Sequence, residues 1–163
     1  MREILFRGKR IDTGEWVYGF LYETEKTSSY NAESYILEKE RLTINYKCVE
    51  GITTHIPFVQ VTPDTVGQYT GLTDKNGKKI FEGDIYTWKD DCGDYHACTI
   101  CFGEYFDGYA DRRATMANGF YVKTLQGETY NFAGFGYSEI EISGNIHDNP
   151  ELLDNSEMLE DKP

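Results

Sequence analysis

The dipeptide Asn76-Gly77 lies between two strand-like runs, residues 67–72 and 79–88. Both residues tolerate the positive φ angles of a tight turn, so the pair is a strong short-range signal for a β-hairpin. Gly83-Asp84, in the middle of the second run, predicts a bend or bulge there. The centre of the chain is therefore expected to form antiparallel strands.

Residues 15–23 predict a strand with two apolar faces, because successive side chains of a strand point to opposite sides. One face carries Trp16, Tyr18, Phe20 and Tyr22, and the other carries Val17, Gly19 and Leu21. Such a strand lies in the centre of a sheet, or one of its faces meets another subunit. We expect the aromatic row to belong to the core.

Similar short runs, separated by turn signals, continue along the chain. Strands are predicted at residues 34–38, 42–49, 52–61, 97–105, 119–124 and 139–146, a loop at 106–118, and a short helical turn after Thr62. Asn149-Pro150-Glu151 has the residue types that open a helix. The sequence therefore predicts an all-β fold, a mostly antiparallel barrel or sandwich with a short C-terminal helix and minor α content.

Length and charge restrict the organisation and the setting. The 163 residues are expected to form one β-rich domain over residues 1–147, followed by a short helix and acidic tail at 148–163. The net charge of −12 repels phosphate, so direct nucleic-acid binding is disfavoured. The charged N-terminus and the absence of a long apolar run predict no signal peptide and no membrane anchor. Four cysteines without an export signal predict a cytoplasmic protein.

Three segments of the chain resemble the YopX family of bacteriophage and prophage proteins. They read FRGKRIDTGEWVYG, TPDTVGQYTGLTDKNGKKIFEGDIY and EISGNIHDNPELL. The resemblance implies a phage-encoded protein of largely β fold that acts in a bacterial cytoplasm. It implies no assigned reaction, so no catalytic role is carried over.

The positions that match the motifs of the family form one candidate binding set of unknown role. They are Gly67, Gln68, Tyr69, Thr70, Gly71, Gly77, Glu82, Gly83, Asp84, Gly144 and Asn145. Most are turn formers, which favours a role in backbone geometry. The alternative is that Gln68, Thr70, Glu82 and Asp84 lie near one another and bind a ligand.

Cys92, His96, Cys98 and Cys101 form the one cluster that resembles a set of metal ligands. Zinc prefers four nitrogen or sulfur donors in a tetrahedron. Cys98 and Cys101 fall in a strand-like run, however, where an extended backbone directs their sulfurs to opposite faces. We therefore expect buried thiols rather than a metal site, and no cofactor.

Three functions remain open. The absence of common catalytic motifs and the surplus of tyrosine favour a phage accessory protein that works by protein–protein contact, as a homo-oligomer or with a phage or host partner. Phe102, Tyr105, Phe106 and Tyr109 are a possible contact surface. The first alternative is an acidic mimic of nucleic acid that blocks a host DNA-binding protein. The second is a small enzyme acting on a nucleotide or nucleic acid through Glu82 and Asp84.

Overall fold

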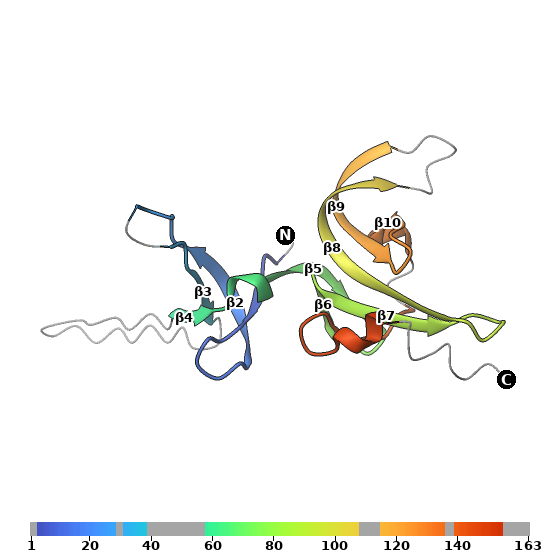
Figure 1. The fold of residues 1–163 in the computed structure, drawn as a ribbon, viewed down its shortest axis with the longest axis horizontal. Helices are drawn as coiled ribbons and strands as arrows, with labels where there is room; N and C mark the ends of the chain where they lie inside the picture. Colours follow the sequence, from blue (N-terminus) through green and yellow to red (C-terminus); the bar gives the residue numbers. More distant parts are fainter. Residues whose placement is uncertain (1–2, 29–30, 39–57, 108–114, 136–138, 155–163) are drawn as a thin grey trace, which may run out of the picture. The chain divides into compact units, whose positions relative to one another are not determined.

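A computed structural model describes residues 3–28, 31–38, 58–107, 115–135 and 139–154 of the chain (Figure 1). The chain divides into two compact units, Met1–Gln68 and Tyr69–Pro163, which we call unit 1 and unit 2. All strand pairings in the described ranges are antiparallel. The predicted fold class, mostly antiparallel β with minor helix, is confirmed. The single domain over residues 1–147 stays a prediction.

Unit 1 is built on a sheet in the order β4-β3-β2-β1. Its strands are β1 (Phe6–Lys9), β2 (Trp16–Glu23), β3 (Ser34–Glu38) and β4 (Phe58–Val61). The strand predicted at 34–38 is present, and the strand predicted at 15–23 occurs as β2. The strand predicted at 42–49, and residues 52–57 of the next predicted strand, lie outside the described residues.

The core of unit 1 lies on the face of the central strand β2 that carries Val17, opposite the aromatic row. Val17 packs there with Ile36 of β3 and Val61 of β4, and Ile36 and Val61 are fully buried. The predicted helical turn is a 3-10 turn, η2 (Pro63–Thr65). Its Thr65 hydroxyl accepts a hydrogen bond from the Lys9 backbone N–H at 2.8 Å, which holds the turn against β1.

Unit 2 contains the predicted hairpin and a five-stranded sheet in the order β10-β9-β8-β7-β11. The hairpin pairs β5 (Gly67–Thr73), whose first two residues pair with β1, with β6 (Lys79–Phe81). The sheet consists of β7 (Asp84–Lys89), β8 (Tyr95–Asp107), β9 (Thr115–Thr124), β10 (Thr129–Asn131) and β11 (Ile142–Asn145). Figure 1 shows β8 and β9 as a long curved hairpin. The predicted bend at Gly83-Asp84 separates β6 from β7.

The core of unit 2 forms where the sheet meets β6 and the 3-10 turn η3 (Phe132–Phe135). Its buried side chains are Ile80, Cys98, Ile100, Val122, Phe132, Ile140 and Ile142. They come from segments far apart in sequence, so the unit depends on long-range pairing rather than on local structure.

Three sequence predictions for unit 2 need correction. The loop predicted at 106–118 is wrong at both ends, because β8 runs to Asp107 and β9 begins at Thr115. The strand predicted at 139–146 is shorter, because β11 covers only Ile142–Asn145, and its pairing with β7 shifts register between Ile142 and Gly144. The short C-terminal helix is not present in the described chain, which forms only the 3-10 turn η4 (Pro150–Leu153).

We expect the substitution Gly19→Ala to destabilise unit 1. A Cβ atom at Gly19 would overlap the backbone carbonyl of Leu37 in the neighbouring strand, and a backbone atom in a paired strand does not move aside easily. Overpacking of this kind lowers the free energy of unfolding by about 1–3 kcal/mol, and occasionally more.

Gly8→Ala is the comparison variant, because a Cβ atom there meets the side chain of Val61 at 3.0 Å, and a side chain can adjust. Urea denaturation should rank the stabilities as wild type, Gly8→Ala, then Gly19→Ala. A Gly19→Ala protein as stable as the wild type would contradict the close approach of β2 and β3.

Candidate functional site

The motif positions of the β5–β6 hairpin make backbone contacts. The Thr70 hydroxyl donates a hydrogen bond to the Ile80 carbonyl at 2.9 Å and accepts one from the Leu72 N–H at 3.2 Å. The rings of Tyr69 and Phe81 lie 5.4 Å apart. Gly71 and Gly77 have positive φ angles. These contacts and angles set the register and the turn of the hairpin.

The motif positions Glu82, Gly83 and Asp84 form the turn that joins β6 to β7. Gly83 has a φ angle of 80°, which favours glycine. Asp84 is 1% exposed, and its carboxylate accepts a hydrogen bond from the Phe81 N–H at 2.8 Å. The Gly83 N–H donates to the Ile100 carbonyl at 2.8 Å, which fixes the turn on β8.

Gly144 and Asn145 hold the turn that follows β11. The Asn145 side-chain oxygen accepts hydrogen bonds from the backbone N–H groups of His147 and Asp148, both at 3.0 Å. Gly144 leaves room for Asn149, whose side chain a Cβ atom at Gly144 would overlap. Asn145 also pairs with Asp84 across β11 and β7.

Asp84 and Asn145 are therefore paired positions in neighbouring strands. The side chains of Thr70, Asp84 and Asn145 all form hydrogen bonds with backbone groups. Gln68 belongs to unit 1, whereas Glu82 and Asp84 belong to unit 2. A ligand bound by Gln68, Thr70, Glu82 and Asp84 stays a prediction.

Sequence reasoning missed Asp74, which links the β5–β6 hairpin to β11. One carboxylate oxygen accepts hydrogen bonds from the N–H groups of Asn76 and Lys78, both at 2.9 Å, and the other accepts one from Ile142 at 3.3 Å. Burial raises the pKa of this carboxyl, but the hydrogen bonds from Lys78, Ile142 and Asn76 outweigh it, so the pKa lies below its ordinary value. Asp preceding Asn-Gly in a predicted turn was the available signal.

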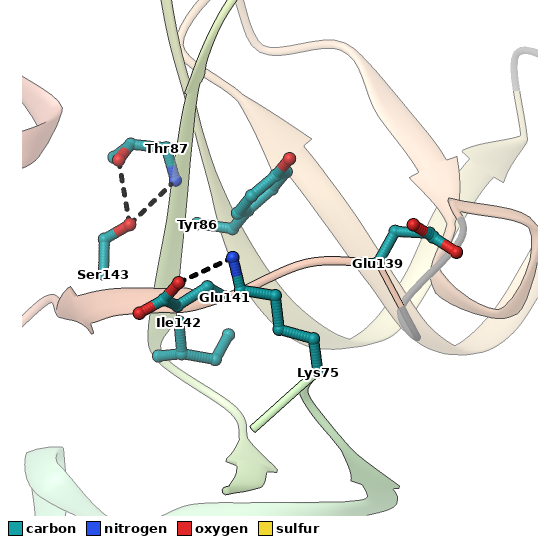
Figure 2. Close-up of a pocket in the computed structure, with 7 residues that line it drawn as sticks. All are labelled: Lys75, Tyr86, Thr87, Glu139, Glu141, Ile142 and Ser143. Atoms are coloured by element: carbon teal, nitrogen blue, oxygen red, sulfur yellow. Dashed lines mark hydrogen bonds and ion pairs between the residues drawn. The ribbon is translucent and has the colours of Figure 1, made fainter. Parts of the chain in front are cut away.

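A polar pocket of about 400 Å³ lies on unit 2 beside β11 (Figure 2). It is lined by Lys75, Tyr86, Thr87, Glu139, Glu141, Ile142 and Ser143. The Lys75 ammonium lies 2.7 Å from the Glu141 carboxylate, and the hydroxyls of Thr87 and Ser143 lie 2.8 Å apart. Burial is the main cause that raises the pKa of the Tyr86 phenol above its ordinary value. The ion pair of Lys75 with Glu141 partly neutralises the charge of the side chains that line the pocket.

The four candidate metal ligands do not form one site. Burial, with repulsion from Cys101, raises the pKa of the Cys98 thiol to about 12, whereas a metal binds the thiolate. His96 lies 3.0 Å from the Asp90 carboxylate and stacks on Trp88, and Cys92 is exposed. Within the described ranges, no group of three or more His, Cys, Asp and Glu side chains is placed to hold a metal ion.

Three side chains of the aromatic row of β2, Tyr18, Phe20 and Tyr22, are exposed and Trp16 is half-buried, so the assignment of the row to the core is wrong. Alternation placed these residues correctly on one face, but Val17, Ile36 and Val61 form the core on the other face. The exposed fractions are 47% for Tyr18, 42% for Phe20, 55% for Tyr22 and 46% for Phe58 of β4. We call Tyr18, Phe20, Tyr22 and Phe58 the aromatic face of unit 1.

The second aromatic cluster divides between core and surface. Tyr105 is buried and stacks on Tyr121 at 4.9 Å, whereas Phe102 and Phe106 are exposed. Tyr109 lies outside the described residues. The part of the chain that the structure describes contains no helix that is long and apolar enough to cross a membrane.

Comparison with known proteins agrees with the resemblance seen in the sequence. The family model described as YopX protein matches residues 5–154. Among solved structures, the chain is similar to the crystal structure of protein EF1440 from Enterococcus faecalis, with 22% sequence identity and a TM-score of 0.41. That match covers 94% of this chain and 100% of the other. No curated protein matches the chain.

Removal of the Asp74 carboxylate should destabilise unit 2. Asp74→Ala leaves three backbone N–H groups without their acceptor, and we expect the free energy of unfolding to fall by about 2–3 kcal/mol. Asp74→Asn keeps one acceptor oxygen but turns an NH₂ group toward Ile142. Its free energy of unfolding should therefore fall by less than that of Asp74→Ala. Asp91→Asn, at an exposed position, is the matched control.

The effect of Asp74 depends on pH. Its folded-state pKa lies below the unfolded value of about 4, so its contribution is complete above that pH and is lost as pH falls through the folded-state pKa. Urea denaturation of wild type and Asp74→Ala should therefore give stabilities that converge in acid. A difference that persists unchanged into acid would argue against the charged carboxylate as the cause.

Cysteine alkylation should distinguish the buried thiol from the exposed one. With a pKa of about 12, Cys98 is thiolate in only about one molecule in ten thousand at pH 8, and its side chain is fully buried. Iodoacetamide followed by peptide mass spectrometry should label Cys92 in the folded protein and leave Cys98 free. Unfolding in urea should make both react. Labelling of Cys98 at the rate of Cys92 in the folded protein would contradict its burial.

Proposed function

The chain belongs to the YopX family, and we propose that it works by protein–protein contact, as a homo-oligomer whose subunits meet through the aromatic face of unit 1. The observation that carries the proposal is the 42–55% exposure of four aromatic side chains on one face of a sheet. Contiguous exposed apolar surface of this kind marks interaction sites in soluble proteins.

The strand register groups these side chains into one surface. Phe20 pairs with Leu37 and Tyr22 with Tyr35, and Leu37 pairs with Phe58 in the next strand. The rings of Tyr22 and Phe58 lie 5.7 Å apart. Aromatic side chains supply much of the binding energy of protein interfaces, because they bury a large area with few rotatable bonds.

Basic side chains border this surface at the other end of β2. The Arg7 guanidinium lies 4.7 Å from the centre of the Trp16 ring, and the Lys9 ammonium lies 5.5 Å from it. Cation–π contacts of this kind hold the indole in place before binding. An ordered surface loses less conformational entropy on association than a mobile one.

The distribution of charge favours a second copy of the chain as the occupant. Residues 1–68 contain 10 acidic and 8 basic residues, a net charge of −2, whereas residues 69–163 contain 18 acidic and 8 basic residues, a net charge of −10. Two copies that meet through unit 1 bring together the parts with the least mutual repulsion. Contact through unit 2 would oppose two strongly acidic surfaces.

We place this activity in a phage- or prophage-encoded accessory protein of the bacterial cytoplasm. This setting rests on the family resemblance, and the proposal assigns no catalytic step to the chain. A phage or host protein bound by the assembled oligomer is compatible with it.

Sedimentation velocity over a range of concentrations tests the proposal. The wild type should sediment as an oligomer, and the double variant Phe20→Ser/Tyr22→Ser should shift to the monomer. Phe106→Ser/Met116→Ser removes two equally exposed apolar side chains from unit 2 and should keep the oligomer. Urea denaturation of each variant confirms that it folds.

A wild-type protein that is monomeric at every concentration would overturn the proposal. So would an oligomer that Phe20→Ser/Tyr22→Ser leaves intact, or one that only the unit 2 variant dissociates.

A further inference from the structure

A second apolar surface lies on the β8–β9 hairpin of unit 2. Phe102 pairs with Phe120, and Phe106 pairs with Met116, so the register places all four on one face of the two strands. We call these four residues the hairpin patch. Phe102 is 46% exposed, and Phe106 and Met116 are each 57% exposed.

The hairpin patch continues the core face of the same two strands. Ile100 and Val122, the pair that precedes Phe102 and Phe120 in the register, are fully buried. Phe120 packs against that core, and its ring lies 4.9 Å from the ring of Phe102. The apolar stripe therefore extends from the core onto the surface, where Phe106 and Met116 form its exposed end.

On the described strand ends that carry the hairpin patch, the charged side chains are acidic. Glu104 lies between Phe102 and Phe106 on the same face and is exposed, and Asp107 ends the strand. Within the described residues 102–107 and 115–120, the charged side chains are Glu104 and Asp107. A second copy of the chain bound at this patch would place its own Glu104 and its acid-rich unit 2 close to the same negative groups, and these like charges would repel one another.

We propose that the hairpin patch binds a partner segment that is both apolar and basic, that is, an amphipathic peptide with Lys or Arg beside its apolar side chains. Its apolar side chains pack on Phe102, Phe106 and Met116, and its cations face Glu104 and Asp107. Methionine adapts its shape to different apolar partners, which suits a peptide groove or face. Attraction to unit 2 increases the rate of encounter and makes binding depend on salt.

This inference is independent of the proposed self-association, because it concerns a different surface and a different partner. Loss of the oligomer leaves it standing, and loss of peptide binding leaves the oligomer standing.

The test uses three fluorescent synthetic peptides and the full-length protein. The first is an amphipathic Leu/Lys peptide, the second has the same composition with its leucines dispersed around the helix, and the third replaces every lysine with glutamate. Fluorescence anisotropy at low and high salt should show binding of the first peptide only, and this binding should weaken as salt rises.

Matched variants then locate the binding. Phe106→Ser/Met116→Ser should weaken binding of the Leu/Lys peptide at least tenfold, and Glu104→Lys, which leaves the apolar side chains in place, should also weaken it. Phe20→Ser/Tyr22→Ser should bind as the wild type does. Equal binding of the first two peptides, or unchanged affinity in the hairpin-patch variants, would reduce the interaction to general charge attraction and overturn the proposal. Absence of binding to the wild type would overturn it too.

Discussion

The carboxylate of Asp74 is the interaction on which the arrangement of unit 2 depends. It satisfies the backbone N–H groups of the hairpin turn and reaches Ile142, sixty-eight positions further along the chain. Besides that bond, the turn of the β5–β6 hairpin is held to the segment that leads into β11 by the bond from the Lys75 N–H to the Ile140 carbonyl and by the ion pair of Lys75 with Glu141. Asp84 plays a similar part at the next turn, where its buried carboxylate accepts a hydrogen bond from the Phe81 N–H. Buried polar groups need such partners, and here they also determine which strands meet.

The two units divide the properties of the surface between them. Unit 1 carries a row of aromatic side chains and little net charge, whereas unit 2 carries most of the acid excess. A surface of the first kind attracts through burial of apolar area, which acts at short range. A surface of the second kind attracts through charge, which acts over about 8 Å at physiological salt. The same chain thus presents two chemically different surfaces.

Local signals in the sequence predicted the parts of the fold that depend on local geometry. Asn76-Gly77 forms the expected turn, and Gly83 bends the chain where the pattern indicated. The error at residues 106–118 has a different origin, because Gly and small residues resemble a loop while cross-strand pairing carries β8 and β9 past them. Pairing across strands is not visible in the local composition.

The candidate surfaces were only partly predictable for a related reason. Alternation in β2 separates two apolar faces, but which face the core covers depends on β3 and β4. Asp74 could be recognised as a turn residue, whereas its bond to Ile142 requires the fold. Three of the five motif glycines, Gly71, Gly77 and Gly83, have the positive φ angles that a role in backbone geometry requires, whereas a binding role for the motif positions stays a prediction.

The order of the two units along the chain has a consequence for synthesis. Unit 1 precedes unit 2, so a ribosome synthesises the strands that carry the aromatic face before it adds the residues that carry most of the negative charge. The nascent chain therefore exposes the aromatic face of unit 1 while its net charge, which keeps proteins apart in solution, is still small. Chains on neighbouring ribosomes of one messenger are close together at that stage, so the proposed self-association through unit 1 would be able to begin before release.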